Sequence, residues 1–210
     1  MNIDPMMFFS EDSTKAELVN QLKNEVIHRD KLIEKGVDTN KLVLVTGHSL
    51  CDSMMFAKYL HDCLKSIGES KGSNFVVMDP VLTSEYMNGI EILQFADNEQ
   101  INIFINNNSK IGYEWFDYII YIKVPGKECR KRFITSLIDK SSDLIDEDAY
   151  DELVDEFANL TDGLDYSFIN MIVDHVIRVA IVNDKKISYK MIRTNVYKMK
   201  ENHGIENYWS

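Results

Sequence analysis

The sequence predicts an α/β core followed by a helical subdomain. Up to about residue 125, runs of β-branched and aromatic residues alternate with amphipathic helical segments, whereas the last third shows helical periodicity with no strong strand signal. We therefore expect three parts, which are a tail at 1–12, an α/β core with an N-terminal helix at 13–125, and a helical subdomain at 126–210.

The elements of the core are expected in a regular order. Thr14-Lys-Ala-Glu17 has the capping-box pattern that begins a helix, and Gly36 is a natural end for it. The continuous apolar run at 41–46 indicates a buried strand of a parallel sheet. The remaining elements expected in the core are a loop at 47–52, a helix at 53–67, strands at 74–79, 101–106 and 116–124, and a short helix at 84–95.

The last third is expected to be a bundle of helices at 126–140, 146–160, 166–182 and 188–201. Eight carboxylates and no Lys or Arg lie between Asp143 and Glu156, whereas the segment Lys185–Lys200 is rich in Lys and Arg. The acidic run is expected to be a solvated helix face or a surface for a basic partner. The opposite signs of the two segments would also suit head-to-tail contacts between subunits.

Composition limits the classes of function. Hydrophobic residues make up 45% and charged residues 27% of the 210 residues, which is typical of a globular chain. The formal charge of −11 argues against broad nucleic-acid binding, with a local basic patch at Lys185–Lys200 as the possible exception. The three cysteines are scattered, which argues against a metal site and favours a reducing compartment. The sequence has no apolar run of membrane-spanning length and no signal-like start, so we expect a cytoplasmic protein. Frequent Asn, Ile, Lys and Asp hint at an AT-rich, viral genome.

The loop after the first strand has the frame of a phosphate-binding loop, because a strand, a glycine loop and an amphipathic helix follow each other. The positions of the frame are Gly47, His48, Ser49, Leu50, Cys51, Asp52, Ser53 and Met54. We compare these residues with the phosphate-loop pattern Gly-x-x-x-x-Gly-Lys-[Ser/Thr]. The first glycine of the pattern is present as Gly47. Asp52 replaces the second glycine, Ser53 the lysine and Met54 the hydroxyl residue.

These replacements predict a degenerate loop that does not hydrolyse a nucleoside triphosphate. A carboxylate at Asp52 would repel a phosphate about 4 Å away by roughly 1–4 kcal/mol, and Ser53 cannot supply the lost positive charge. His48 and Cys51 are expected to be ordinary surface or capping residues, since no partner for catalysis stands beside them. We therefore expect no catalytic residue in this loop and no cofactor.

Several later segments together resemble the AAA+ ATPases, over about residues 36–209. The run Phe116-Asp-Tyr-Ile-Ile-Tyr-Ile-Lys-Val-Pro-Gly-Lys-Glu-Cys-Arg130 is similar to the last core strand of that family and the helix after it. Thr161-Asp-Gly-Leu-Asp-Tyr-Ser-Phe-Ile-Asn-Met-Ile172 resembles the start of a helix in the small lid subdomain. Weaker similarities lie at 75–91, 185–188 and 204–209. The resemblance implies an AAA+ core with a helical lid.

The departures from the family pattern fall at positions with nucleotide chemistry. The resemblance puts a polar sensor at Asn106 or Asn107, but the acidic pair that holds magnesium has no counterpart. Glu114–Trp115 stands where arginine fingers would lie. Tyr166 occupies the lid position of a glycine that faces the base pocket, and Phe168 replaces an acidic residue.

The expected function is that of a catalytically inactive, AAA+-like structural or regulatory subunit. Its expected partner is a protein, either an active AAA+ ATPase, another assembly or a second copy of itself, with no membrane and no nucleic acid. The alternative is a nucleoside or nucleotide kinase-like enzyme, or an ATP-binding protein, which would use ATP and magnesium at Gly47–Met54. That alternative predicts a fifth parallel strand near Val176–Val182, whereas the AAA+ reading predicts a four-helix lid. A third possibility is a plain α/β domain related to neither family.

Overall fold

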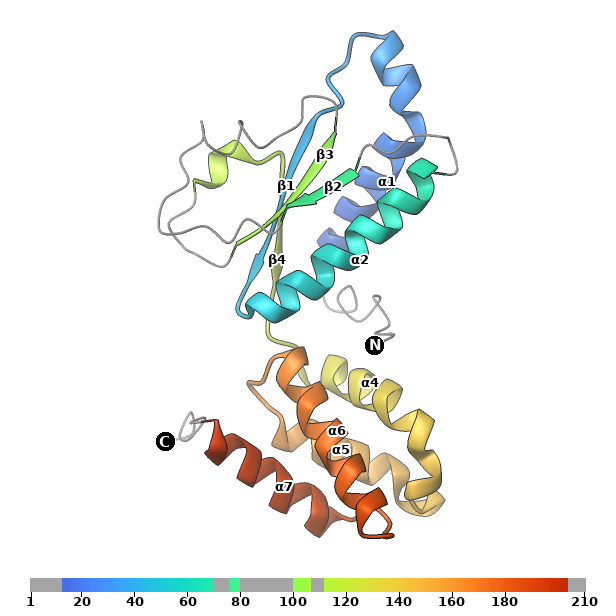
Figure 1. The fold of residues 1–210 in the computed structure, drawn as a ribbon, viewed down its shortest axis with the longest axis vertical. Helices are drawn as coiled ribbons and strands as arrows, with labels where there is room; N and C mark the ends of the chain where they lie inside the picture. The colour runs from blue at the N-terminus through green and yellow to red at the C-terminus, as the bar shows by residue number, and fades with distance from the viewer. Residues whose placement is uncertain (1–12, 70–75, 80–99, 107–111, 204–210) are drawn as a thin grey trace. The chain divides into compact units, whose positions relative to one another are not determined.

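The computed structural model describes residues 13–69, 76–79, 100–106 and 112–203. The chain divides into two compact units, with the boundary between Lys123 and Val124. The first is an α/β unit and the second is a helical unit (Figure 1). The expected mixed α/β class is confirmed.

The sheet of the α/β unit is parallel and has the strand order β2-β3-β1-β4. Its strands are β1 Lys41–Gly47, β2 Val76–Asp79, β3 Ile101–Ile105 and β4 Tyr118–Ile122. In the register of the sheet, Val43 of β1 lies opposite Ile103 of β3 and Tyr118 of β4. β1 is a central strand, and its residues 42–46 are all buried, so side chains on both of its faces are covered, which explains its continuous apolar run.

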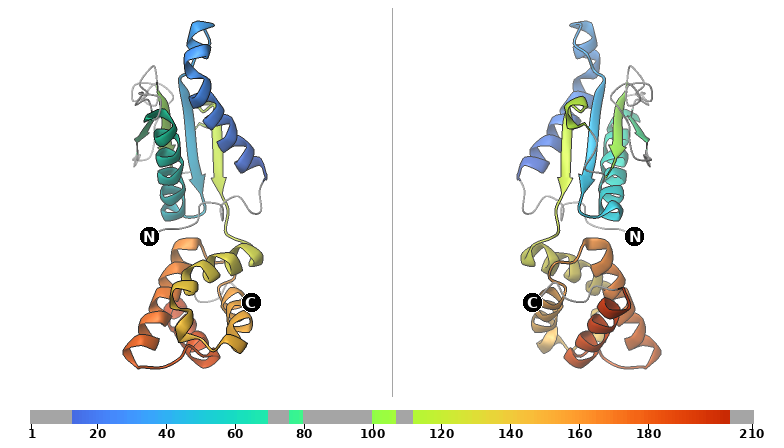
Figure 2. Two further views of the ribbon diagram at one scale, coloured as in Figure 1. Left: turned by 90° about the vertical axis from the view of Figure 1, so that its right-hand side faces the viewer. Right: turned by 90° about the vertical axis from the view of Figure 1, so that its left-hand side faces the viewer.

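Two helices cover one face of this sheet (Figures 1 and 2). They are α1, Ser13–Glu34, and α2, Leu50–Glu69. Gly36 follows α1 with a φ of +68°, a conformation that favours glycine, and Val37 N–H closes the helix on the Leu32 carbonyl oxygen at 2.9 Å. The hydroxyl of Tyr118 on β4 donates to Glu25 Oε1 of α1 at 2.5 Å, which fixes α1 over the edge of the sheet.

The helical unit contains four α-helices joined by short turns (Figure 2). They are α4 Lys127–Ile138, α5 Tyr150–Leu160, α6 Tyr166–Val182 and α7 Tyr189–Asn202, with 3₁₀ turns at Asp139–Leu144 and Glu147–Ala149. Asp165 and Ser188 cap α6 and α7, since their side chains accept from Phe168 N–H and Met191 N–H. The four helices expected from the sequence are confirmed. The fifth strand that the kinase-like alternative expects at 176–182 is not formed, because these residues belong to α6.

The main difference from the expected elements is at the start of α2. The helix begins at Leu50 and not at Ser53, so three residues expected in a loop are helical. In α1, Ile33 is 53% exposed, although it is apolar. The short helix expected at 84–95 lies outside the described residues. No helix in the described part of the chain is long and apolar enough to cross a membrane.

Candidate functional site

The candidate site lies where the carboxyl ends of β1 and β3 meet in the α/β unit. Val45 and Ile105 are the last paired residues of the two strands, and Asn106 N–H donates to the Val45 carbonyl oxygen at 3.2 Å. Asn106 is buried, and the register of β1 and β3, continued by one residue, puts it beside Thr46, directly before Gly47. The structure thus brings Asn106 to the loop at Gly47–Met54, at the sheet edge where open α/β folds bind their ligands. Asn107 lies outside the described residues.

Gly47 is required by the close approach of β1 to β4. Gly47 pairs with Ile122, and a Cβ added at Gly47 would lie 2.9 Å from Ile122 Cβ and closer still to the Ile122 carbonyl oxygen. His48 N–H then donates to that same oxygen at 3.1 Å. The glycine therefore serves strand packing, and the amide of His48 is bonded within the sheet.

Ser49 is the N-cap of α2. Its Oγ accepts from Asp52 N–H at 3.3 Å, and its carbonyl oxygen accepts from Ser53 N–H and from Ser53 Oγ, each at 3.0 Å. The connection between β1 and α2 is therefore only His48 and Ser49 long. A phosphate-binding loop needs several amides that curl around the phosphate, whereas here those of His48, Asp52 and Ser53 already have protein acceptors.

The side chains at two of the three altered positions point into the unit. Asp52 is 2% exposed and Ser53 is fully buried, although both occupy the first turn of α2. The exposed side chains of this turn are His48, Leu50, Cys51 and Met54. No Lys or Arg lies between Gly47 and Met54. No group of His, Cys, Asp and Glu that could hold a metal ion occurs among the described residues.

Tyr166 belongs to the core of the helical unit. It is the first residue of α6 and only 3% exposed, and its ring meets the edge of Phe133 on α4 with ring centroids 5.1 Å apart. Trp115, in the α/β unit, lies in a 3₁₀ turn before β4 and is 42% exposed. Tyr166 is thus a packing residue. Trp115 presents an apolar side chain at the position where the resemblance would place an arginine finger.

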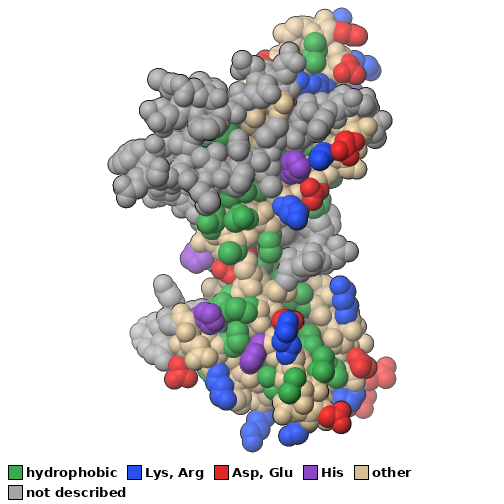
Figure 3. Space-filling view, viewed as in Figure 1, with side chains coloured by type: hydrophobic (Ala, Val, Ile, Leu, Met, Phe, Trp, Pro, Cys, Tyr) green, Lys and Arg blue, Asp and Glu red, His purple; other side chains and the backbone are tan. Residues whose placement is uncertain are grey.

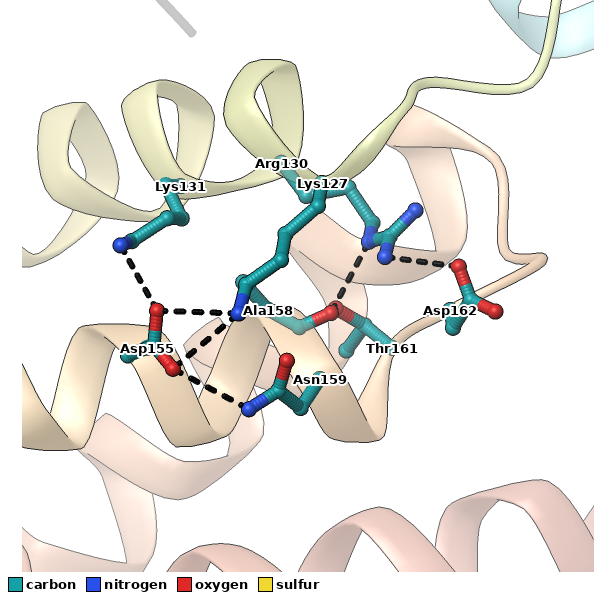
Figure 4. Close-up of polar contacts among 8 residues, drawn as sticks. All are labelled: Lys127, Arg130, Lys131, Asp155, Ala158, Asn159, Thr161 and Asp162. Carbon is teal, nitrogen blue, oxygen red and sulfur yellow. Dashed lines mark hydrogen bonds and ion pairs between the residues drawn. The ribbon is translucent and has the colours of Figure 1, made fainter.

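Arg130 is a buried organiser of the helical unit (Figure 4). Its guanidinium donates to the Ala158 carbonyl oxygen at 2.9 Å and to the Pro125 carbonyl oxygen at 2.7 Å, and it forms an ion pair with Asp162 at 2.7 Å. Burial lowers the pKa of the nearby Lys200, the Asp162 charge opposes that shift, and the positive charge of Arg130 adds to it. Arg130 therefore joins the start of α4 to the end of α5 and to the turn after it.

Asp155 of α5 is an electrostatic link to α4 (Figure 4). Its carboxylate binds Lys131 Nζ at 2.7 Å and Lys127 Nζ at 3.2 Å, and it accepts from Asn159 Nδ2 at 3.1 Å. The hydrogen bonds from Lys131 and then Lys127 lower the pKa of Asp155 to about 2. Part of the acidic run is thus neutralised from α4.

Arg193 of α7 neutralises another residue of the same run, and two neighbouring residues add hydrogen bonds to it. Arg193 Nε binds Glu156 Oε1 at 2.5 Å, and the Tyr189 hydroxyl donates to Glu152 at 2.8 Å. Lys186 donates to the backbone carbonyl oxygen of Asp143. Opposite charges of the acidic and basic segments therefore pair within one chain. Only the charged side chains that remain unpaired could serve a contact between subunits.

The sequence held a signal for the capped turn that our expectation missed. Ser49-Leu-Cys-Asp52 has the Ser-x-x-acid pattern that precedes an apolar helical run, so it predicts a helix that begins at Leu50. The phosphate-loop frame at the same residues favoured a later start. For the contacts of Arg130 with Ala158 and Asp162 there was no local signal, because only the fold brings these residues to it.

Comparisons of the sequence with models of known protein families and with curated proteins give no match. Any function proposed for the chain therefore rests on its residues and on their geometry.

Proposed function

We propose that this chain is a structural or regulatory protein that acts through protein contacts and has an AAA+-like, P-loop-like core that no longer uses nucleotide. The observation that carries the proposal is the capped turn at the carboxyl end of β1. The amides of His48, Asp52 and Ser53 are bonded within the protein, and the side chains of Asp52 and Ser53 are buried.

A triphosphate would find few of its usual partners at this turn. Phosphate binding at a helix N-terminus depends on amides that are free to donate and on a nearby cation. The turn supplies no Lys or Arg, and its acidic residue Asp52 is in the first turn of α2. The free energy that remains for binding is therefore too small to hold a hydrated magnesium–nucleotide complex.

Two features support the AAA+-like part of the proposal. A unit of four α-helices, α4–α7, follows the parallel sheet, which is the order of core and lid that the resemblance implies. Asn106 lies beside the end of β1, at the place that the resemblance gives to a polar sensor. The kinase-like alternative has no comparable support, since its fifth strand is not formed at 176–182.

The surface supports a role in protein contacts. Exposed apolar side chains occur on both units (Figure 3), among them Leu50, Met54, Ile119, Tyr121, Ile181 and Val182. The carboxylates of Asp146, Glu147 and Asp148 are exposed and make no ion pair among the described residues. Protein interfaces combine apolar side chains with charged ones, so a surface of this kind can bind a protein partner.

The experiment that tests the proposal is titration of the purified chain with magnesium–ATP by calorimetry, together with a turnover assay. We expect no heat of binding and no phosphate release above the rate without protein. An Asp52→Asn variant should behave in the same way, because the capped turn stays when the charge is removed. Asp62→Asn, an exposed change on the same helix, is the matched control. Micromolar binding with turnover by the natural chain would contradict the proposal.

A further inference from the structure

Helix α7 has an outward face that combines lysines with an exposed aromatic ring. Lys190, Tyr197 and Lys198 are exposed, and their spacing of seven and eight residues puts them on one side of the helix, opposite the buried Ile192. Glu201 bounds this side at its C-terminal end. Neither lysine makes an ion pair among the described residues. We call Lys190, Tyr197 and Lys198 the basic face of α7.

The complementary combination, apolar side chains near carboxylates, lies at the end of α6. Val182 is 83% exposed and Ile181 is 60% exposed, and with Tyr197 at 61% they are the most exposed large apolar side chains in the described part of the chain. The turn after α6 lies against the 3₁₀ segment before α5, because Ile187 N–H donates to the Leu144 carbonyl oxygen at 2.8 Å.

This backbone bond puts the apolar pair at the same end of the helical unit as the carboxylates of residues 146–148. Those carboxylates are exposed, and they make no ion pair among the described residues. We call residues 146–148 and 181–182 together the acidic tip. The helical unit thus carries two surfaces of opposite charge, each with an exposed apolar centre.

We propose that the basic face of α7 binds the acidic tip of a second copy of this chain. The lysines meet the carboxylates of residues 146–148, and the ring of Tyr197 covers Ile181 and Val182. The charges on both sides are those left over after the ion pairs within the helical unit have formed, so the contact breaks none of these pairs. The second copy is named as the occupant because the same chain carries both complementary surfaces.

The two surfaces do not meet within one chain. On the neighbouring side of α7, Tyr189 binds Glu152 and Arg193 binds Glu156, so α7 is fixed on α5 with its basic face turned to solvent. A contact between two different surfaces of the same chain is heterologous, and each bound copy leaves one tip and one basic face free. The contact therefore builds a ring or an open chain of copies.

The inference rests on the proposed function in one respect, because it names a partner for a protein that acts through protein contacts. Self-association and nucleotide binding are measured separately, so either idea can fail without the other. Few side chains take part and the charges are exposed, so we expect an association that is weak and that salt reduces.

The first test is sedimentation of the full chain over a range of concentrations. We expect species that grow beyond the dimer as the concentration rises. Tyr197→Asp, which disables the basic face, and Val182→Asp, which disables the tip, should each weaken the association by about tenfold or more. Ile33→Asp, at an exposed apolar position of α1, is the matched control and should leave it unchanged. Circular dichroism melting of each variant shows that it is folded.

A mixture of the two variants tests whether the contact is heterologous. Tyr197→Asp keeps a working tip and Val182→Asp keeps a working basic face, so the mixture should form a complex that stops at two chains. A natural chain that stays monomeric at every concentration would overturn the proposal. So would a mixture that stays monomeric, or a folded Tyr197→Asp or Val182→Asp variant that associates like the natural chain.

The last test identifies the surfaces. A carbodiimide joins a lysine amine to a carboxylate in direct contact, and a mixture of ¹⁴N- and ¹⁵N-labelled chains shows by mass spectrometry which links join two chains. We expect links from Lys190 or Lys198 of one isotope to residues 146–148 of the other. Links that are absent under conditions of association, or that join other surfaces, would contradict the proposed contact.

Discussion

The Ser53 hydroxyl donates a hydrogen bond to the Ser49 carbonyl oxygen at 3.0 Å, one helical turn earlier. Ser53 stands where a phosphate-binding loop would have its lysine, yet here it is fully buried. Its amide binds the same carbonyl oxygen, so both donors of Ser53 are used inside the helix. This relationship turns a loop that should hold phosphate into an ordinary capped helix start.

Gly47→Ala should strongly destabilise the α/β unit. The new methyl group would overlap the Ile122 backbone, which cannot rotate away as a side chain could, so we expect a loss of about 3 kcal/mol in the free energy of unfolding. Gly36→Ala is the control, since its Cβ would meet nothing and only the positive φ opposes it, at a cost of about 1 kcal/mol. Urea unfolding measures both variants, and equal effects would show that the contact with Ile122 is unimportant.

Arg130→Met should destabilise the helical unit by about 3 kcal/mol. The change leaves the Pro125 and Ala158 carbonyl oxygens without their donor and removes the ion pair of the buried guanidinium with the exposed Asp162. Arg130→Lys should restore little, because one ammonium group cannot reach three acceptors in different directions. Arg178→Met, an exposed change within α6, should alter the stability by less than about 0.5 kcal/mol. Full rescue by lysine in urea unfolding would contradict this account of Arg130.

Asp155→Asn should alter the acid stability of the chain. The pKa of Asp155 is lowered from 3.8 to about 2 in the folded protein, so its contribution is complete above pH 4 and is lost as the pH falls toward 2. The variant should therefore melt at a lower temperature than the natural chain at neutral pH, and this difference should vanish between pH 4 and pH 2. Melting curves across this range measure it, with Asp174→Asn as the control for a pair within one helix. A difference that persists at pH 2 would contradict the link from Asp155 to α4.

Tyr166→Ala should unfold or loosen the helical unit. The buried ring packs against Phe133, and loss of such an aromatic side chain costs about 3–5 kcal/mol. Tyr197→Ala, at a tyrosine that is 61% exposed, should cost much less. Thermal melting separates the two variants. A stable, folded Tyr166→Ala protein would show that the tyrosine is kept for something other than packing.

The order of the elements was predictable from the sequence, and the start of α2 was not predicted. The run at 41–46 and the helical periods after 126 carry their signal within a few residues, so β1 and α4–α7 could be expected. At Ser49 two patterns compete, and the capping pattern decides the local structure because it satisfies amides without a ligand. The pairing of Glu156 with Arg193 joins residues far apart in the sequence, so only the fold could reveal it.

The most direct test of the central claim is the amide NMR spectrum of the ¹⁵N-labelled chain during titration with magnesium–ATP. The amides of His48, Asp52 and Ser53 already have acceptors in the protein. We therefore predict that the signals of Gly47–Met54 and Asn106 stay in place up to millimolar nucleotide. Saturable shifts of these signals would contradict the account, because they would show that the turn opens and binds phosphate.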